Sequence, residues 1–183
     1  MYIDFFYKNL LGLLSLISIA KAVEYTPIYY APFEISKKFI ISQGFNGKET
    51  HTDAINRYAV DLAMPQGENI CAAQTGEVID LYDGQGWFTT DTQNSNYVRI
   101  EHANQQISDY EHLKPGSIKV RVGEKLKARQ CFAQVGNTGK TTGPHLHFAV
   151  LEEKNGELIS VPFKFIDPQR RAYTPEYLQW VRN

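Results

Sequence analysis

The sequence predicts an all-β domain whose strands pair mainly in an antiparallel arrangement. Short runs rich in β-branched and aromatic residues recur along the chain, and turn signals such as Asn-Gly and Asp-Gly separate them. Between residue 22 and the C-terminal end, no stretch shows the apolar spacing of an amphipathic helix. The 183 residues, 43% hydrophobic and 21% charged, fit one globular domain of ordinary size.

Each predicted strand is bounded by a turn or a loop. The predicted strands cover residues 39–45, 58–63, 76–82, 97–101, 117–122, 131–135 and 146–151. Asn46-Gly47 follows the first strand, Asp83-Gly84 follows the third, and Asn155-Gly156 follows the last. Residues 84–96 form a polar loop, and loops of this length often border a binding site. A short helix over residues 175–181 is expected near the end of the chain.

The first 22 residues have the pattern of a secretory signal peptide. Residues 9–20 are mostly apolar and follow Lys8, and Ala20-Lys21-Ala22 fits a signal-peptidase site, which makes Val23 the expected mature start. The apolar run is short for a membrane span, which needs about 20 residues. We therefore expect an exported protein, periplasmic or secreted, that leaves the membrane after cleavage. An uncleaved N-terminal anchor is the alternative.

Charge and cysteine content narrow the class of protein further. The net charge is −1 and no basic cluster stands out, which argues against nucleic acid as a partner. Cys71 and Cys131 are the two cysteines of the chain, and each lies in a strand-like segment. An even count in an exported protein favours one disulfide, and two buried free thiols are the alternative.

Five residues that could serve a metal site are spread along the chain. His145 and His147 lie one residue apart at the start of a predicted strand, so their side chains face the same way. His51 follows a turn-rich stretch, and His112 lies between a strand and the Pro115-Gly116 turn. Asp61 stands between Val60 and Leu62, where a carboxylate is costly unless it is paired or ligating. Two imidazoles and a carboxylate form a common catalytic zinc set, and further histidines can act on the attacking water.

Three segments carry a resemblance to a known family. They read GFNGKETHTDAINRYAVDLAMPQGENICAAQTGEVI, YVRIEHANQQISDYEHLKPGSIKVRVGEKL and QCFAQVGNTGKTTGPHLHF, and together they span roughly residues 40–150. The chain resembles the lysostaphin-like zinc endopeptidases, the M23 or LytM-type peptidases, which cut peptidoglycan peptide cross-links. The resemblance implies a mainly antiparallel sandwich with an open groove, acting as a monomer on peptidoglycan peptides.

The resemblance also assigns roles to the five residues. The family's zinc ligands match His51, Asp61 and His147, and its catalytic histidines match His112 and His145. Zn²⁺ is therefore the expected cofactor, while no substrate-binding residue is assigned. The implied organisation is a signal peptide (1–22), a short N-terminal segment (23–38), a peptidase domain (39–166) and a C-terminal tail (167–183).

The chain departs from the family at a few positions, and two other functions are the alternatives. The spacing between His51 and Asp61 is longer than in compact members, and Ala149 replaces an acidic residue common in relatives. His102 lies outside the catalytic set and is expected to be a structural hydrogen-bond partner. A LytM-type regulator that activates amidases is disfavoured because such proteins typically lose zinc ligands. A cupin-like barrel with Glu152 as a ligand would leave His51 and Asp61 unused.

Overall fold

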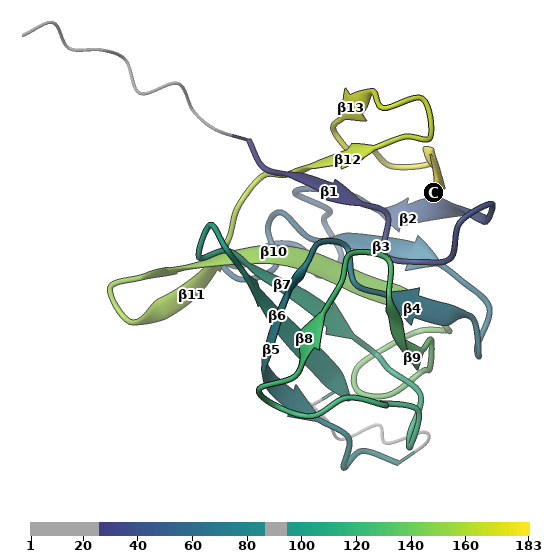
Figure 1. Ribbon diagram of the computed structural model, residues 1–183. Helices are drawn as coiled ribbons and strands as arrows, with labels where there is room; N and C mark the ends of the chain where they lie inside the picture. The colour runs from purple at the N-terminus through teal and green to yellow at the C-terminus, as the bar shows by residue number, and fades with distance from the viewer. Residues whose placement is uncertain (1–25, 87–94) are drawn as a thin grey trace, which may run out of the picture.

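All regular secondary structure in the described residues, 26–86 and 95–183, is β-strand in the computed structural model (Figure 1). The strands are β1 (Ile28–Tyr30), β2 (Lys38–Gln43), β3 (Val60–Ala63), β4 (Asn69–Cys71), β5 (Gly76–Tyr82), β6 (Tyr97–His102), β7 (Ile107–Glu111), β8 (Lys125–Leu126), β9 (Cys131–Gln134), β10 (Leu146–Lys154), β11 (Glu157–Ser160), β12 (Lys164–Ile166), β13 (Ala172–Tyr173) and β14 (Trp180–Arg182). The all-β prediction is confirmed.

Two sequence predictions fall on residues outside these ranges. The expected signal peptide, residues 1–22, is not among the described residues, and neither is most of the polar loop, residues 87–94. Within the ranges that are described, no helix has the length and apolar character to cross a membrane.

A nine-stranded antiparallel sheet forms the body of the described molecule. Eight strands follow the order β14-β2-β3-β10-β7-β6-β5-β8, and β11 pairs with the far part of β10. Strand β10 is the longest, and it pairs with β3 along one edge and with β7 along the other. This arrangement brings residues from three distant parts of the sequence to neighbouring positions on the sheet.

Two smaller sheets complete the fold. Strands β4 and β9 form an antiparallel pair, while β1 pairs in parallel with β12, which also pairs with β13. In Figure 1, β1, β12 and β13 lie together above the large sheet. The expected N-terminal segment (23–38) and C-terminal tail (167–183) contribute β1, β13 and β14 to the sheets.

Aromatic side chains dominate the core and anchor the central strand. The fully buried large side chains include Tyr29, Phe33, Tyr110, Phe132, Phe148, Phe163 and Phe165. On β10, the Phe148 ring lies 5.2 Å from the ring of Tyr110 and 5.3 Å from that of Phe163, in edge-to-face geometry. Because successive side chains on a strand alternate faces, Phe148 fixes β10 in the core while His147 points to the other face.

A disulfide joins Cys71 on β4 to Cys131 on β9. The two residues are register partners in the β4–β9 pair, so the bond ties together strands that are 60 residues apart in the sequence. The prediction of one disulfide is confirmed, and no cysteine of the chain remains free.

Two predicted elements are wrong. Residues 175–181 do not form a helix: Leu178 has a left-handed backbone (φ 61°), and β14 then pairs with β2 through Trp180↔Ile40 and Val181↔Phe39. Burial of Val181 on an available sheet edge outweighs local helix preference. Residues 117–122 form no strand either. Their backbone contact with β9 is the single bond from the Lys119 N–H to the Phe132 carbonyl, before a turn at residues 121–124.

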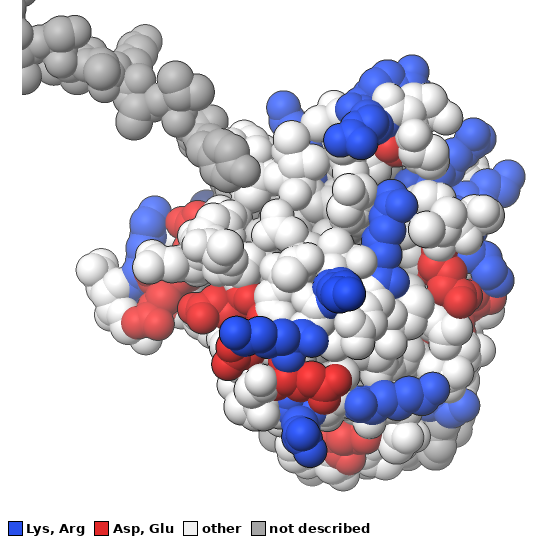
Figure 2. Space-filling model, viewed as in Figure 1, with Lys and Arg blue, Asp and Glu red and all other residues white. Residues whose placement is uncertain are grey.

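Charged side chains of both signs mix on the surface seen in Figure 2. Lys and Arg are spread over the viewed face, and groups of Asp and Glu lie between them. Because both signs occur together, charge alone does not mark a binding surface on this face.

Candidate metal centre

The candidate site lies where β3, β10 and β7 run side by side. Asp61 on β3 and His147 on β10 are register partners, and His147 is in turn the partner of Glu111 on β7. Side chains of directly opposed residues point to the same face of a sheet. The pairing therefore brings the Asp61 carboxylate and the His147 imidazole together, although 86 residues separate them in the sequence.

His51 reaches the same place from the long connection between β2 and β3. Its backbone N–H donates to the Gly47 carbonyl (3.1 Å), which closes a turn that aims the side chain inward. The ring Nδ1 lies 2.8 Å from the Gly44 carbonyl oxygen, which can only accept, so Nδ1 carries the proton. This tautomer leaves the Nε2 lone pair facing Asp61.

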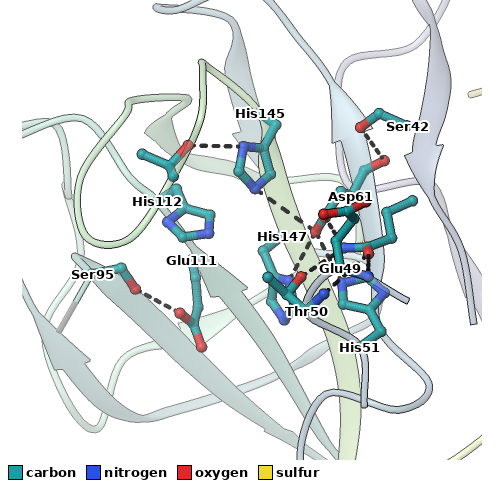
Figure 3. A network of polar contacts seen from close by, with 12 residues as sticks. Ser42, Glu49, Thr50, His51, Asp61, Ser95, Glu111, His112, His145 and His147 are labelled. Atoms are coloured by element: carbon teal, nitrogen blue, oxygen red, sulfur yellow. Dashed lines mark hydrogen bonds and ion pairs between the residues drawn. The ribbon is translucent and has the colours of Figure 1, made fainter. Parts of the chain in front are cut away.

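Three side chains converge on one carboxylate oxygen (Figure 3). The Asp61 Oδ1 atom lies 2.9 Å from His147 Nδ1, 3.3 Å from His51 Nε2 and 3.8 Å from His145 Nε2. One ligand atom each from His51, Asp61 and His147 all lie within 4.8 Å of one another, and all three residues are buried. Two imidazoles and a carboxylate at such separations fit the donor set and open fourth position of a catalytic zinc site.

The charges within this cluster stabilise each other. Burial alone would raise the pKa of the Asp61 carboxyl, but the hydrogen bond from His147 and the contact with the His51 imidazole outweigh it and hold that pKa well below its usual range. Burial lowers the pKa of His147, yet the hydrogen bond to Asp61 and the charge of Glu111 raise it to about 9. Without a metal ion, His147 is therefore expected to hold a proton on Nδ1, the atom that faces Asp61. A bound metal ion would displace this proton and neutralise the carboxylate in its stead.

His112 and His145 lie beside the cluster, with ring centroids 4.4 Å apart. The Nδ1 atom of His112 lies 2.7 Å from the Thr138 carbonyl oxygen, and that of His145 lies 2.8 Å from the Gly143 carbonyl oxygen. Both rings therefore hold the proton on Nδ1 and keep Nε2 available. Burial, followed by the charges of His145 and His147, lowers the pKa of His112 to about 4, and burial lowers that of His145.

The backbone at His112 is itself unusual. Its φ is 63°, in the left-handed region that few residues other than glycine adopt, and the residue is buried at the end of β7. Such conformations persist where the surrounding structure holds them, and they cluster at functional sites. The backbone turn directs the imidazole toward His145 rather than along the sheet.

Two polar residues next to the cluster were not singled out from the sequence. Glu111 is half-buried beside His147, and its carboxylate accepts a hydrogen bond from the Ser95 hydroxyl (2.6 Å). Its position next to His112 on a mostly buried strand is the sequence feature that could have indicated a role at the site. Gln43 donates to Asp61 Oδ2 (2.8 Å), and nothing in its local sequence marks it.

Neither His102 nor Glu152 belongs to the cluster. His102 Nδ1 lies 3.0 Å from the Thr75 carbonyl oxygen and Nε2 lies 2.9 Å from the Ser108 hydroxyl, as expected for a structural hydrogen-bond partner. Glu152 accepts a hydrogen bond from the Gln106 amide (2.7 Å), away from the three clustered ligands. A cupin-like use of Glu152 therefore has no support in the geometry.

A cavity of about 750 Å³ borders the region on the β2 side. Residues 42–49 line one wall, and residues 174–177 of the C-terminal segment line the other. Gly44 is packed closely here, because a Cβ on it would lie 3.2 Å from the Tyr177 backbone nitrogen. The C-terminal segment therefore shapes the surface next to the loop that carries His51.

The sequence of this chain is similar to a known protein family and to curated proteins. Peptidase family M23 matches residues 56–160. An uncharacterized metalloprotease from Buchnera aphidicola is 34% identical over 66% of this chain, and the peptidoglycan DD-endopeptidase ShyC from Vibrio cholerae is 34% identical over 67%. These alignments cover 31% and 28% of the two relatives, so the chain spans about a third of the length of the curated relatives it matches.

The fold has a counterpart among solved structures. The catalytic domain of the prophage-encoded M23 protein EnpA from Enterococcus faecalis superposes with a TM-score of 0.54 and 25% sequence identity. The match covers 72% of this chain and 94% of that domain. Because the family match extends over more than half of the 183 residues, the chain belongs to peptidase family M23.

Proposed function

We propose that the chain is a zinc-dependent endopeptidase that hydrolyses peptide cross-links of bacterial peptidoglycan. The observation that carries this proposal is the buried His51–Asp61–His147 cluster with His112 and His145 next to it. Membership of family M23 and the similarity to ShyC, named a peptidoglycan DD-endopeptidase, support the choice of substrate.

In this proposal His51, Asp61 and His147 hold one zinc ion. The Nε2 atom of His51, the Nδ1 atom of His147 and Oδ1 of Asp61 are the ligand atoms, since these face one another in the cluster. Zinc, when bound, supplies a Lewis acid that acidifies water and polarises the scissile carbonyl. The carbonyl of Gly44 holds the His51 ring in the tautomer that presents Nε2.

His112 and His145 carry the proton transfers. Both rings bind a backbone carbonyl through Nδ1 and present Nε2, and their lowered pKa values favour the neutral form that accepts a proton. The proton removed from the attacking water passes to Nε2 of one ring and then to the nitrogen of the leaving amine as the peptide bond breaks. Before that second transfer, the same Nε2–H donates a hydrogen bond to the oxyanion formed from the scissile carbonyl.

The regulator alternative is less well supported. A LytM-type activator of amidases needs no metal ligands, whereas this chain retains three clustered ligands and two adjacent histidines. Retention of a complete set with fixed tautomers is costly without a chemical role, because buried polar groups must all find partners. The geometry therefore favours an enzyme.

The proposal includes export and the organisation expected from the sequence. Residues 1–22 would be removed as a signal peptide, and the remaining chain would act as a monomer in the periplasm or outside the cell. The peptidase domain is placed at residues 39–166, between the segment 23–38 and the tail 167–183. N-terminal sequencing of the exported protein tests the cleavage: a start at Val23 is expected, and retention of residues 1–22 contradicts it.

Digestion of purified sacculi tests the activity. The zinc-loaded protein is expected to release peptides whose new amino and carboxyl ends map by mass spectrometry to the cross-link. Glycan cleavage, amidase products or intact cross-links would contradict the proposal. A His145→Ala protein with normal zinc content is the matched inactive control.

A further inference from the structure

Gln43 contacts both a proposed metal ligand and the loop that carries another. Its amide Nε2 donates to Asp61 Oδ2 (2.8 Å) and to the Thr50 hydroxyl (2.7 Å). Its Oε1 accepts from the backbone N–H groups of Glu49 (3.1 Å) and Thr50 (3.2 Å). A Gln side chain has two donor hydrogens and two acceptor lone pairs, so these four bonds use its full capacity.

The orientation of this amide is fixed by its partners. Backbone N–H groups can only donate, so the end of Gln43 that faces Glu49 and Thr50 must be the oxygen. The NH₂ end then has to face the Asp61 carboxylate, where it finds an acceptor. Figure 3 shows Glu49 and Thr50 in the same group of side chains as Asp61 and His51.

An irregularity in the sheet aims Gln43 at Asp61. The β2–β3 register runs Ile41↔Leu62 and then Gln43↔Asp61, so Ser42 is an extra residue on β2. Bulges of this kind turn a side chain to a new direction and are common next to active sites. Gly47 completes the arrangement, because a Cβ on that residue would overlap the Gln43 side chain.

We propose that Gln43 is a positioning residue that orients the Asp61 carboxylate and the His51 loop for metal binding. The bond to Oδ2 leaves Oδ1 to face His51 and His147, which makes Asp61 a ligand through one oxygen. The bonds to Glu49 and Thr50 hold the loop immediately before His51. This inference rests on the proposed function in assigning zinc to the cluster.

Two variants remove the contacts of Gln43, and one neighbouring variant serves as control. Gln43→Leu keeps the size of the side chain without its polar atoms, while Gly47→Ala displaces Gln43 without altering its chemistry. Ser42→Ala is the matched control, since the Ser42 hydroxyl donates to the main-chain carbonyl of Asp61 (3.2 Å) and not to its carboxylate.

Zinc affinity, measured by competition with a chromophoric chelator, is the first readout. Loss of an outer hydrogen bond to a metal ligand weakens metal binding by about 10- to 100-fold, and this is expected for Gln43→Leu and Gly47→Ala. Ser42→Ala is expected to bind zinc like the wild type. Wild-type affinity in Gln43→Leu, or an equal loss in Ser42→Ala, would overturn the proposal.

Amide hydrogen exchange of the metal-free proteins is the second readout. The amides of Glu49 and Thr50 are expected to exchange faster in Gln43→Leu than in Ser42→Ala, because their acceptor is gone. Unchanged exchange at both amides would overturn the proposal. If Gln43→Leu does not fold, Gly47→Ala provides the same comparison. A wild-type protein that binds no zinc would refute the proposed function, while the exchange rates would still decide the role of Gln43.

Discussion

Replacing His112 is expected to abolish most of the hydrolysis while leaving the metal in place. The ring contributes no atom to the His51–Asp61–His147 cluster, and its Nδ1 bond goes to the Thr138 carbonyl. A positioned general base contributes about 10²- to 10⁴-fold in rate, which corresponds to roughly 3 to 5 kcal/mol of activation free energy. His112→Asn is the preferred variant, because asparagine tolerates the left-handed backbone (φ 63°) better than alanine does.

The assay compares kcat/KM on a cross-linked muropeptide with zinc content for the same preparation. His112→Asn and His145→Ala should each retain one zinc per chain and lose activity. His102→Gln is the control, since it removes another buried histidine that lies outside the cluster. Zinc loss in His112→Asn as complete as in His147→Ala would refute the division of roles, and so would near-normal activity.

Three further predictions concern stability and the support of the site. Replacing Cys71 and Cys131 by serine removes the disulfide between residues 60 positions apart, and the chain-entropy estimate gives a loss of roughly 4 kcal/mol in the free energy of unfolding. A melting scan should show a lower melting temperature with unchanged zinc content, and an unaltered melting temperature contradicts the prediction. Burial lowers the pKa of His102 below 6.5, so its contribution to stability is present above that pH and lost as pH falls toward the folded-state pKa. The wild type should therefore lose more stability than His102→Gln between pH 7 and pH 5 (about the range in which a histidine near its ordinary pKa titrates), and parallel pH profiles argue against it. Gly139 has φ 76°, and a Cβ there would lie 2.8 Å from the Ser95 Cβ. Gly139→Ala should therefore lower the free energy of unfolding by about 1–2 kcal/mol and reduce activity by shifting Thr138. Gly143→Ala should not destabilise the fold, because a Cβ on Gly143 meets no atom within 4 Å.

The strands of the central sheet could be predicted well where local pattern and burial agree. Residues 76–82 coincide with β5, and residues 97–101 fall one residue short of β6. Burial alternates along β6, and β5 ends at the Asp83-Gly84 turn, so short-range information is sufficient for these two strands. The turn chemistry at Asn155 is also borne out, since this residue adopts φ 55° between β10 and β11.

Elements that depend on distant partners could not be predicted this way. Strand β14 forms because β2 offers an edge and Val181 becomes buried, while the isolated segment 175–181 has a helix-like composition. The parallel pairing of β1 with β12 joins residues more than 130 positions apart. Neither pairing can be recognised in the local sequence, because β1, β12 and β14 have only three residues each.

In the candidate site too, some residues can be predicted from the sequence and others depend on the pairing of distant strands. Residue type and family resemblance predict His51, Asp61 and His147 as ligands, and the structure brings these three together. The role of Gln43 cannot be predicted from the sequence, because its position opposite Asp61 depends on a bulge after Ile41 that the sequence does not signal. Glu111 likewise reaches His147 only through the β7–β10 register.

Metal analysis of the wild-type, Asp61→Ala and His147→Ala proteins tests the central claim most directly. Each variant removes one of the three side chains that converge within 4.8 Å, and removal of either should leave an incomplete ligand set. The account predicts one zinc per wild-type chain and near-complete loss of zinc in both variants. Stoichiometric zinc in Asp61→Ala or in His147→Ala would contradict it.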